Sequence, residues 1–211
     1  MKGVRRTIGT AQDGKAPLVS ADIKEIVGSL PATLIGLRDR ALLLVGFSGA
    51  FRRSELVALN FEDLEFTEEG LVVTLRRSKT DQESRGRRIG IPILPHSDAC
   101  AVRALREWLA ASHITAGPIF RPVRLGNRIS AARLSGFGVA RIIKKRLPAG
   151  KDATRYSGHS PRSGFCTSAC SGGAPIKSIQ NVTGHRSVDM LLRYVRETSL
   201  FRKNALSLTG L

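Results

Sequence analysis

The sequence has 211 residues, 42% of them hydrophobic and 24% charged, which suits one well-packed domain and argues against intrinsic disorder. Its 34 Lys and Arg against 17 Asp and Glu give a formal net charge of +17 and a pI near 11.1. This charge predicts a polyanionic partner, with nucleic acid ahead of an anionic membrane surface. We find no signal-peptide pattern, and the longest apolar run, residues 41–47, is too short to span a bilayer. The sequence therefore predicts a soluble, cytoplasmic protein with no membrane partner, and its odd count of three cysteines argues against a disulfide framework.

In chain order, the first 18 residues are basic and without period, and we interpret them as a tail or linker. Helical spacing of apolar residues begins after Ser20, which we expect to cap the helix, and Pro31 ends this element. Further helices are predicted over residues 37–47 and 52–59.

Between residues 61 and 93 the hydrophobic period changes to that of strands. Short runs at 61–66, 71–75 and 89–93 predict a small antiparallel sheet, and the connection at 77–88 is long for a hairpin. Helical patterns then return at 99–111, 135–147, 161–169, 175–182 and 187–206. The predicted fold class is therefore mainly α with a small antiparallel β-sheet, an α+β fold.

The helix expected at 135–147 has one apolar face and one basic face. A basic helix face is often simply solvated, but the charge of the whole chain favours contact with phosphates. Arg53 is predicted to be a further DNA contact. The apolar face carries Val139, Ile142 and Ile143, and the basic face carries Arg141, Lys144 and Lys145.

Two short segments contain histidines that are candidates for a functional site. His159 and Arg162 are three residues apart at the expected start of a helix, so their side chains point the same way, and Pro161 between them suits a first helical turn. His185 follows Gly184, which we expect to end a helix, so this histidine lies in a tight inter-helix turn. Taken singly, each segment has a simpler explanation. His159 and Arg162 would be an incidental pair on the surface, and His185 would be an ordinary turn residue.

Tyr194 lies on the last predicted helix, about 120° from the centre of its apolar stripe at 100° per residue. Arg193 and Arg196 lie further round, so the phenol is placed to meet an anion. The alternative is a half-buried aromatic at the edge of the stripe. The predicted stripe consists of Val188, Leu191, Leu192 and Val195.

Five such segments, in this order, resemble the tyrosine recombinases, or phage-type integrases, over nearly the whole chain from about Leu18. The family's first arginine stands in a segment like G-x-R-x-S-E-L, matched here by Ala50-Phe51-Arg52-Arg53-Ser54-Glu55-Leu56. Its lysine lies on a β-hairpin, and Lys79 in Ser-Lys-Thr is the best match.

The remaining three segments complete the resemblance. The family's H-x-L-R cluster is matched by His159 to Arg162, with Pro161 where the family usually has an apolar residue. Its L-G-H or T-G-H motif is matched by Thr183-Gly184-His185, and its R-Y pair, about nine residues later, by Arg193-Tyr194. Proline at 161 leaves two outcomes open, tolerance at a helix start or a tilt of Arg162.

The resemblance implies a reaction and a role for each residue. Arg52 and Arg162 would hold the phosphate oxygens, His185 would donate a further hydrogen bond, and Glu55 would orient an arginine. His159 would take the proton of the nucleophile, Tyr194, and Lys79 would protonate the leaving 5′ oxygen. The 3′-phosphotyrosine product keeps the bond energy, so we expect no ATP, metal or other cofactor.

The resemblance also implies partners and a domain division. We expect a double-stranded DNA recombination site in the nucleoid of a bacterial or phage system, and a homo-oligomer on DNA through the last helix, around residues 200–208. Residues 19–211 are predicted as the catalytic domain. Residues 1–18 are predicted as a basic tail, or the remnant of a linker from a missing N-terminal core-binding domain.

Three alternatives stay open at this point. A truncated recombinase remnant could bind DNA without cutting it, and a relaxing topoisomerase of the same catalytic class would cut with little sequence preference. An RNA-binding module is disfavoured, because aromatic residues are only 5% of the chain and nothing resembles a base-stacking platform.

Overall fold

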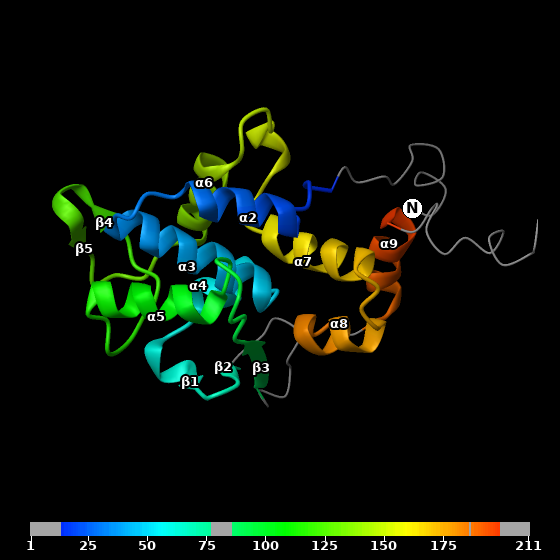
Figure 1. Cartoon of the computed structure of the whole chain (residues 1–211), viewed down its shortest axis with the longest axis horizontal. Helices are drawn as coiled ribbons and strands as arrows, with labels where there is room; N and C mark the ends of the chain where they lie inside the picture. Colours follow the sequence, from blue (N-terminus) through cyan, green and yellow to red (C-terminus); the bar gives the residue numbers. More distant parts are fainter. Residues whose placement is uncertain (1–13, 77–85, 186, 199–211) are drawn as a thin grey trace, which may run out of the picture.

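The computed structural model describes residues 14–76, 86–185 and 187–198. Within these ranges helices dominate and the strands form two small antiparallel sheets (Figure 1). This arrangement confirms the predicted α+β class. The helices are α2 (Ser20–Ser29), α3 (Leu34–Ser48), α4 (Arg53–Ala58), α5 (Ala101–Ser112), α6 (Gly136–Arg146), α7 (Ser160–Ser171), α8 (Ile176–Thr183) and α9 (Asp189–Thr198), and the strands are β1 (Leu64–Phe66), β2 (Gly70–Leu75), β3 (Arg87–Pro92), β4 (Val123–Arg124) and β5 (Arg128–Ile129).

Helix α3 is the centre of the main core. Its residues 41–45 are all buried, and it packs against α2, α5 and α7. From α5, Trp108 is fully buried and its indole Nε1 donates a 2.7 Å hydrogen bond to the Ile119 carbonyl. Leu18 is buried in the same core, and its amide donates to the Ser160 carbonyl at 2.9 Å.

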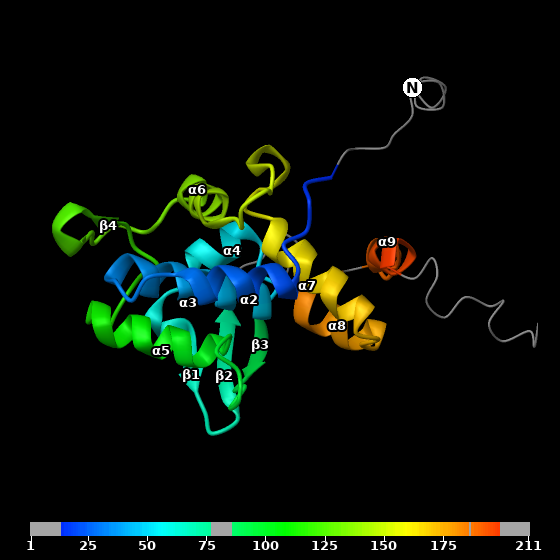
Figure 2. The same cartoon turned by 45° about the horizontal axis from the view of Figure 1, so that its top comes forward.

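The larger sheet has the order β1-β2-β3 with both pairs antiparallel. On β3, Ile89 and Ile91 are buried while Arg88 and Gly90 are exposed, as expected for a strand with one face on the core. Figure 2 shows this sheet and α5 on one side of α3, with α4 and α6 on the other.

Helix α6 has the two faces that the sequence predicts. Val139, Ile142 and Ile143 are buried. Ser135 caps the helix through its Oγ, which accepts from the Gly138 amide at 3.1 Å. At the other end, the Arg146 Nε lies 2.8 Å from the buried Asp39 carboxylate on α3, so an ion pair fixes α6 to the core.

Helices α7, α8 and α9 enclose a second, smaller apolar cluster, at one end of the molecule in both cartoon views (Figures 1 and 2). Cys166, Ile179 and Leu191 are buried in it, and Tyr194 packs against them from α9. These three helices therefore pack around an apolar cluster of their own, and α7 also packs against the main core.

Two local predictions were wrong. Ser20 does not cap α2, because Val19 occupies the cap position and the Asp22 carboxylate accepts its amide hydrogen at 3.1 Å. Val188 is 42% exposed and precedes α9, so it is not part of a buried stripe. The small β4-β5 hairpin was not predicted, because its strands of two residues are too short to show a period.

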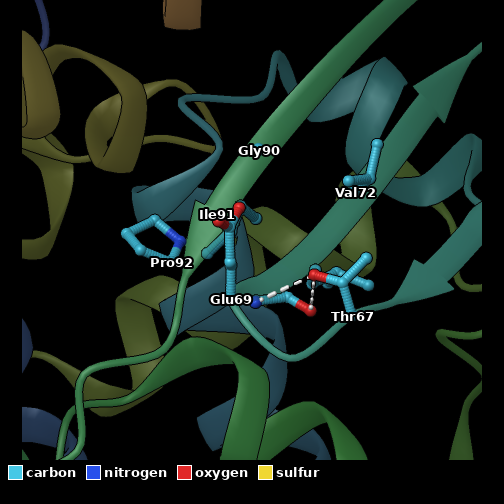
Figure 3. A pocket seen from close by; sticks show the side chains of 8 residues that line it. Thr67, Glu69, Val72, Gly90, Ile91 and Pro92 are labelled. Atoms are coloured by element: carbon cyan, nitrogen blue, oxygen red, sulfur yellow. Dashed lines mark hydrogen bonds between the residues drawn. The ribbon is translucent and has the colours of Figure 1, made fainter.

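A pocket of about 260 Å³ lies at the end of the larger sheet. Figure 3 shows its lining residues around the β1-β2 turn, where the Gly70 amide donates to Thr67 Oγ1 at 3.1 Å. It is lined by residues 67, 69–72 and 90–92, at the opposite end of β3 from Arg87. In the described ranges, no helix is both long enough and apolar enough to cross a membrane.

Candidate active site

Arg52 and Glu55 form the first part of the site, at the start of α4. Gly49 is the C-cap of α3, and Arg52 is the N-cap of α4. The Glu55 carboxylate accepts two hydrogen bonds from Arg52, one from its amide at 2.8 Å and one from Nη1 at 2.6 Å. Burial by itself would raise the pKa of Glu55, but the hydrogen bonds and charge of Arg52, with the charge of Arg162, outweigh it and lower that pKa. Glu55 is therefore ionised and orients Arg52.

Arg162 projects from the first turn of α7 into this region. Its side chain is only 1% exposed, and its Nη1 donates to the Ala50 carbonyl at 2.6 Å. Pro161 sits within the first turn, where no amide hydrogen bond is lost, and Arg162 keeps these contacts. Burial, and then the charge of Arg52, lowers the pKa of Arg162 to about 10, so it stays positively charged at neutral pH.

His185 reaches Arg162 from the turn after α8. Gly184 adopts a left-handed conformation with φ 64° and ends α8, as the sequence predicts. The His185 Nδ1 lies 2.8 Å from Thr183 Oγ1, and its Nε2 lies 3.2 Å from Arg162 Nη2. Burial, followed by the charges of Arg162 and Arg52, lowers the pKa of His185 to about 4. This histidine is therefore neutral at pH 7.

His159 is the N-cap residue of α7 and its side chain reaches solvent. Its surroundings still withdraw it from bulk water, and this desolvation, with the charges of Arg162 and Arg52, lowers its pKa. The neutral imidazole is thus favoured at neutral pH. A neutral imidazole at the surface of a cationic cluster can accept a proton from an approaching group.

Arg87 joins this cluster, although the sequence did not single it out. It begins β3, and its Nη1 donates to the Val182 carbonyl at 2.7 Å. Burial, which outweighs the favourable charge of Glu55, lowers the pKa of Arg87. No sequence signal distinguishes it from Arg88, its neighbour, which instead pairs with the exposed Glu65 at 2.7 Å.

The last two predicted catalytic residues are Tyr194 and Lys79. Tyr194 is half-buried on α9 and packs against the cluster that contains Cys166, which is one helical turn beyond Arg162 on α7. This is the position of an aromatic at the edge of an apolar stripe, and the nucleophilic role of Tyr194 stays a prediction. Lys79 lies outside the described residues, as does the segment 200–208 predicted to contact a second protomer.

The side chains predicted to contact DNA are all exposed. Arg53 places its guanidinium carbon 6.0 Å from the ring centroid of Phe137, which is 85% exposed at the start of α6. The basic face of α6 is exposed along the same helix. This face, defined by Arg141, Lys144 and Lys145, is free of the core contacts that bury Ile142 and Ile143. Among the described side chains, no group of three or more His, Cys, Asp or Glu is placed to hold a metal ion.

Comparison with known proteins identifies the family of this chain. The model of the phage integrase family matches residues 18–200. The chain belongs to the phage integrase family. This match confirms the resemblance that the five sequence segments indicate.

Individual members of the phage integrase family show how much of a longer protein the chain covers. It is 42% identical over 209 residues to an integrase/recombinase xerD homolog of Selenomonas ruminantium, covering 98% of this chain and 61% of that protein. It is 30% identical over 164 residues to a tyrosine recombinase XerC of Syntrophus aciditrophicus, covering 78% of this chain and 50% of that protein. The chain thus spans about half to three fifths of the length of these curated relatives.

Solved structures of low sequence identity share the phage integrase fold. A XerH site-specific recombinase bound to a palindromic difH substrate matches with a TM-score of 0.64 at 17% identity, over 92% of this chain and 53% of that one. A XerA recombinase matches with a TM-score of 0.63 at 20% identity, over 89% of this chain and 61% of that one. These matches agree with the α+β class.

Proposed function

We propose that this chain is the catalytic part of a site-specific DNA recombinase or integrase, which breaks and rejoins strands through Tyr194. The observation that carries the proposal is the convergence of Arg52, Arg162 and His185, from three distant segments, around one point. Family membership supports the same activity, and the names of the similar proteins are those of recombinases and integrases. In this proposal residues 19–211 form the catalytic domain.

The proposed reaction is one in-line displacement and its reverse. The Tyr194 oxygen attacks the scissile phosphorus while the bond from phosphorus to the 5′ oxygen breaks. A free phenol has a pKa near 10, so attack by Tyr194 at neutral pH needs a base, and in this proposal His159 takes the proton because its neutral imidazole is favoured. Lys79 protonates the 5′ oxygen. A 5′ hydroxyl of another strand then attacks the phosphotyrosine, which restores Tyr194 and a phosphodiester without ATP.

The arginines supply the electrostatic part of catalysis in this scheme. In-line attack places additional negative charge on the non-bridging oxygens, and guanidinium groups hold such oxygens with charge-assisted hydrogen bonds. Arg162 is almost fully buried, so solvent screens its charge little. Glu55 holds Arg52 in place, and this positioning is its proposed role.

The proposed substrate is double-stranded DNA, bound with the help of Arg53 and the basic face of α6. We further propose that protomers assemble on the DNA through residues 200–208, and that the protein acts at the nucleoid in the cytoplasm. The net charge of +17 supports a polyanionic partner.

A covalent-capture experiment tests the function. Full-length protein is incubated with a library of nicked duplexes that carry a randomised central segment, and strands that remain attached to protein after denaturing electrophoresis are sequenced. We expect a defined set of captured sequences with the wild type and none with Tyr194→Phe. Tyr156→Phe, at the only other tyrosine, is the matched control and retains the adduct.

Two outcomes overturn the proposal. An adduct with Tyr194→Phe equal to that of the wild type removes Tyr194 as the nucleophile. Sequence-specific binding in a shift assay with no adduct for any duplex favours the DNA-binding remnant instead.

A further inference from the structure

Arg87 connects the start of β3 to the turn that carries His185. It pairs with Leu75 at the end of the β2-β3 ladder, where its backbone position is fixed. Its Nη1 donates to the Val182 carbonyl at 2.7 Å, in the last turn of α8. A Cβ atom on Gly184 would lie only 2.5 Å from this Nη1, so the guanidinium lies directly against the backbone of the turn. The strand thereby holds the residues immediately before His185.

The second terminal nitrogen of the Arg87 guanidinium has an unusual environment. The Arg87 Nη2 is buried and has no hydrogen-bond partner within the described part of the chain. Its charge acts on Arg162 and His185 and is acted on by the Arg52–Glu55 pair. Three guanidinium groups thus share one carboxylate in this region. A buried cation beside two other guanidinium groups lowers the stability of the fold. This cost argues that Arg87 has a role other than stabilising the fold.

We propose that Arg87 is a positioning residue of the DNA-cleavage site, which holds the Thr183–His185 turn against Arg162 through the Val182 carbonyl. The inference rests on the proposed function and adds a residue that the sequence motifs of the site do not contain. Arg87 acts through the turn and not by contact with the reacting atoms, because its Nη1 is bound to the backbone and its Nη2 is buried.

The contacts of Arg87 determine which variants are informative. Methionine at this position keeps most of the length of the side chain but removes both the donor and the charge. Lysine keeps the charge, and its ammonium group can still donate the single hydrogen bond to the Val182 carbonyl. Arg88 on the same strand is exposed and pairs with Glu65 away from the site, so Arg88→Met is the matched control.

The first measurement uses a nicked duplex recovered by covalent capture. Arg87→Met lowers the single-turnover rate of adduct formation at saturating DNA by about 10- to 100-fold, because a displacement of about 1 Å at a reacting centre costs on this order. The dissociation constant for the duplex changes by less than about threefold, as expected for a residue that makes no DNA contact. Arg87→Lys recovers most of the rate, and Arg88→Met leaves it unchanged.

The second measurement uses the free protein and does not depend on activity. The imidazole signals of His185 are followed by nuclear magnetic resonance as pH is varied. Arg87→Met raises the pH at which His185 titrates, because the turn loosens and a nearby positive charge is lost, while Arg88→Met does not.

The outcomes separate the two proposals. A wild type that forms no adduct overturns the proposed function, and the titration of His185 then decides the role of Arg87 by itself. Arg87→Met that cleaves at the wild-type rate, or that leaves the His185 signals unchanged, overturns the positioning role. A loss of DNA affinity as large as the loss of rate also overturns it, because Arg87 would then be a DNA contact.

Discussion

Arg162 and His185 are joined by a hydrogen bond whose direction is fixed by chemistry. A guanidinium can only donate, so the His185 Nε2, 3.2 Å from Arg162 Nη2, is the acceptor and carries no hydrogen. The hydrogen of the neutral ring is then on Nδ1, which donates to Thr183 Oγ1 at 2.8 Å, and the threonine hydroxyl donates to the Ile179 carbonyl at 2.8 Å. His185 therefore presents a hydrogen-bond acceptor toward Arg162. The proposed hydrogen bond from His185 to a phosphate requires a hydrogen on Nε2, which either a change of tautomer or protonation of the ring provides.

Thr183→Val is expected to disturb this chain of hydrogen bonds at its buried end. Valine has the same shape but cannot accept from Nδ1, so the buried N–H loses its partner and the free energy of unfolding falls by about 1–3 kcal/mol. Nitrogen chemical shifts of the His185 ring report the tautomer directly. Thr183→Ser, which keeps the hydroxyl, is the control, and an unchanged Nδ1–H signal in Thr183→Val contradicts the assignment.

The stability of the protein is expected to fall as the pH falls from about 6.5 to about 4. In this window His185 binds a proton in the unfolded chain, where its pKa is near 6.5, but not in the folded protein, where its pKa is about 4. Folding therefore excludes a proton, at a cost of up to roughly 3 kcal/mol.

Denaturant unfolding of the wild type and of His185→Gln at pH 7 and pH 4.5 measures this effect. The variant should lose part of the pH dependence and keep the part that comes from His159, whose pKa is also lowered. Identical pH dependence in both proteins excludes His185 as a source.

Glu55→Ala is expected to destabilise the protein by about 3 kcal/mol and to weaken cleavage. The substitution leaves Arg52 without its carboxylate partner, next to the like charge of Arg162, and the carboxylate removed is buried. Glu65→Ala is a matched control, because it breaks the exposed Arg88–Glu65 pair and should cost less than about 1 kcal/mol. Equal losses of stability in the two variants would show that burial of the Arg52–Glu55 pair has no consequence.

Gly164→Ala is expected to lower the melting temperature strongly. A Cβ atom at this position of α7 would lie 1.7 Å from the Leu18 carbonyl oxygen, so the backbone on one side must move, at a cost of about 1–3 kcal/mol or more. Gly28→Ala on α2 has open space around its Cβ and gains helix propensity, so it should be neutral or stabilising by up to about 1 kcal/mol. A Gly164→Ala protein as stable as the wild type would mean that Leu18 does not pack against α7.

Alanine substitution on the basic face of α6 is expected to reduce the salt dependence of DNA binding. Each of Arg141, Lys144 and Lys145 that contacts a phosphate contributes about 0.9 to the slope of log K against log salt concentration. Figure 2 shows α5 on the opposite side of α3 from α6. Arg103, an exposed residue of α5, is therefore the control, and Arg103→Ala should leave the slope unchanged. A slope that responds equally to both faces would indicate diffuse charge attraction without a defined DNA-binding face.

The periodic segments were predictable because their signal is local. Apolar spacing along 135–147 determined which face of α6 is buried, and alternation along β3 determined the inward positions of Ile89 and Ile91. The left-handed turn at Gly184 followed from glycine alone. The predicted cap of α2 was wrong by one residue. Val19 occupies the cap position because its amide donates to the Asp22 carboxylate, a contact that the preference of serine for cap positions does not reveal.

The sequence by itself determined the family, the basic character and the set of candidate residues, because motif order and charge are properties of the chain. Only the tertiary structure decided which of these groups meet. Arg162 reaches the Ala50 carbonyl across 112 residues of sequence, and Arg87 reaches Val182 across 95. It also decided that His185 is neutral, since its lowered pKa arises from burial and from guanidinium groups on other segments. Local patterns determine backbone conformation and which face is apolar, whereas contacts between distant polar groups depend on how the whole core packs.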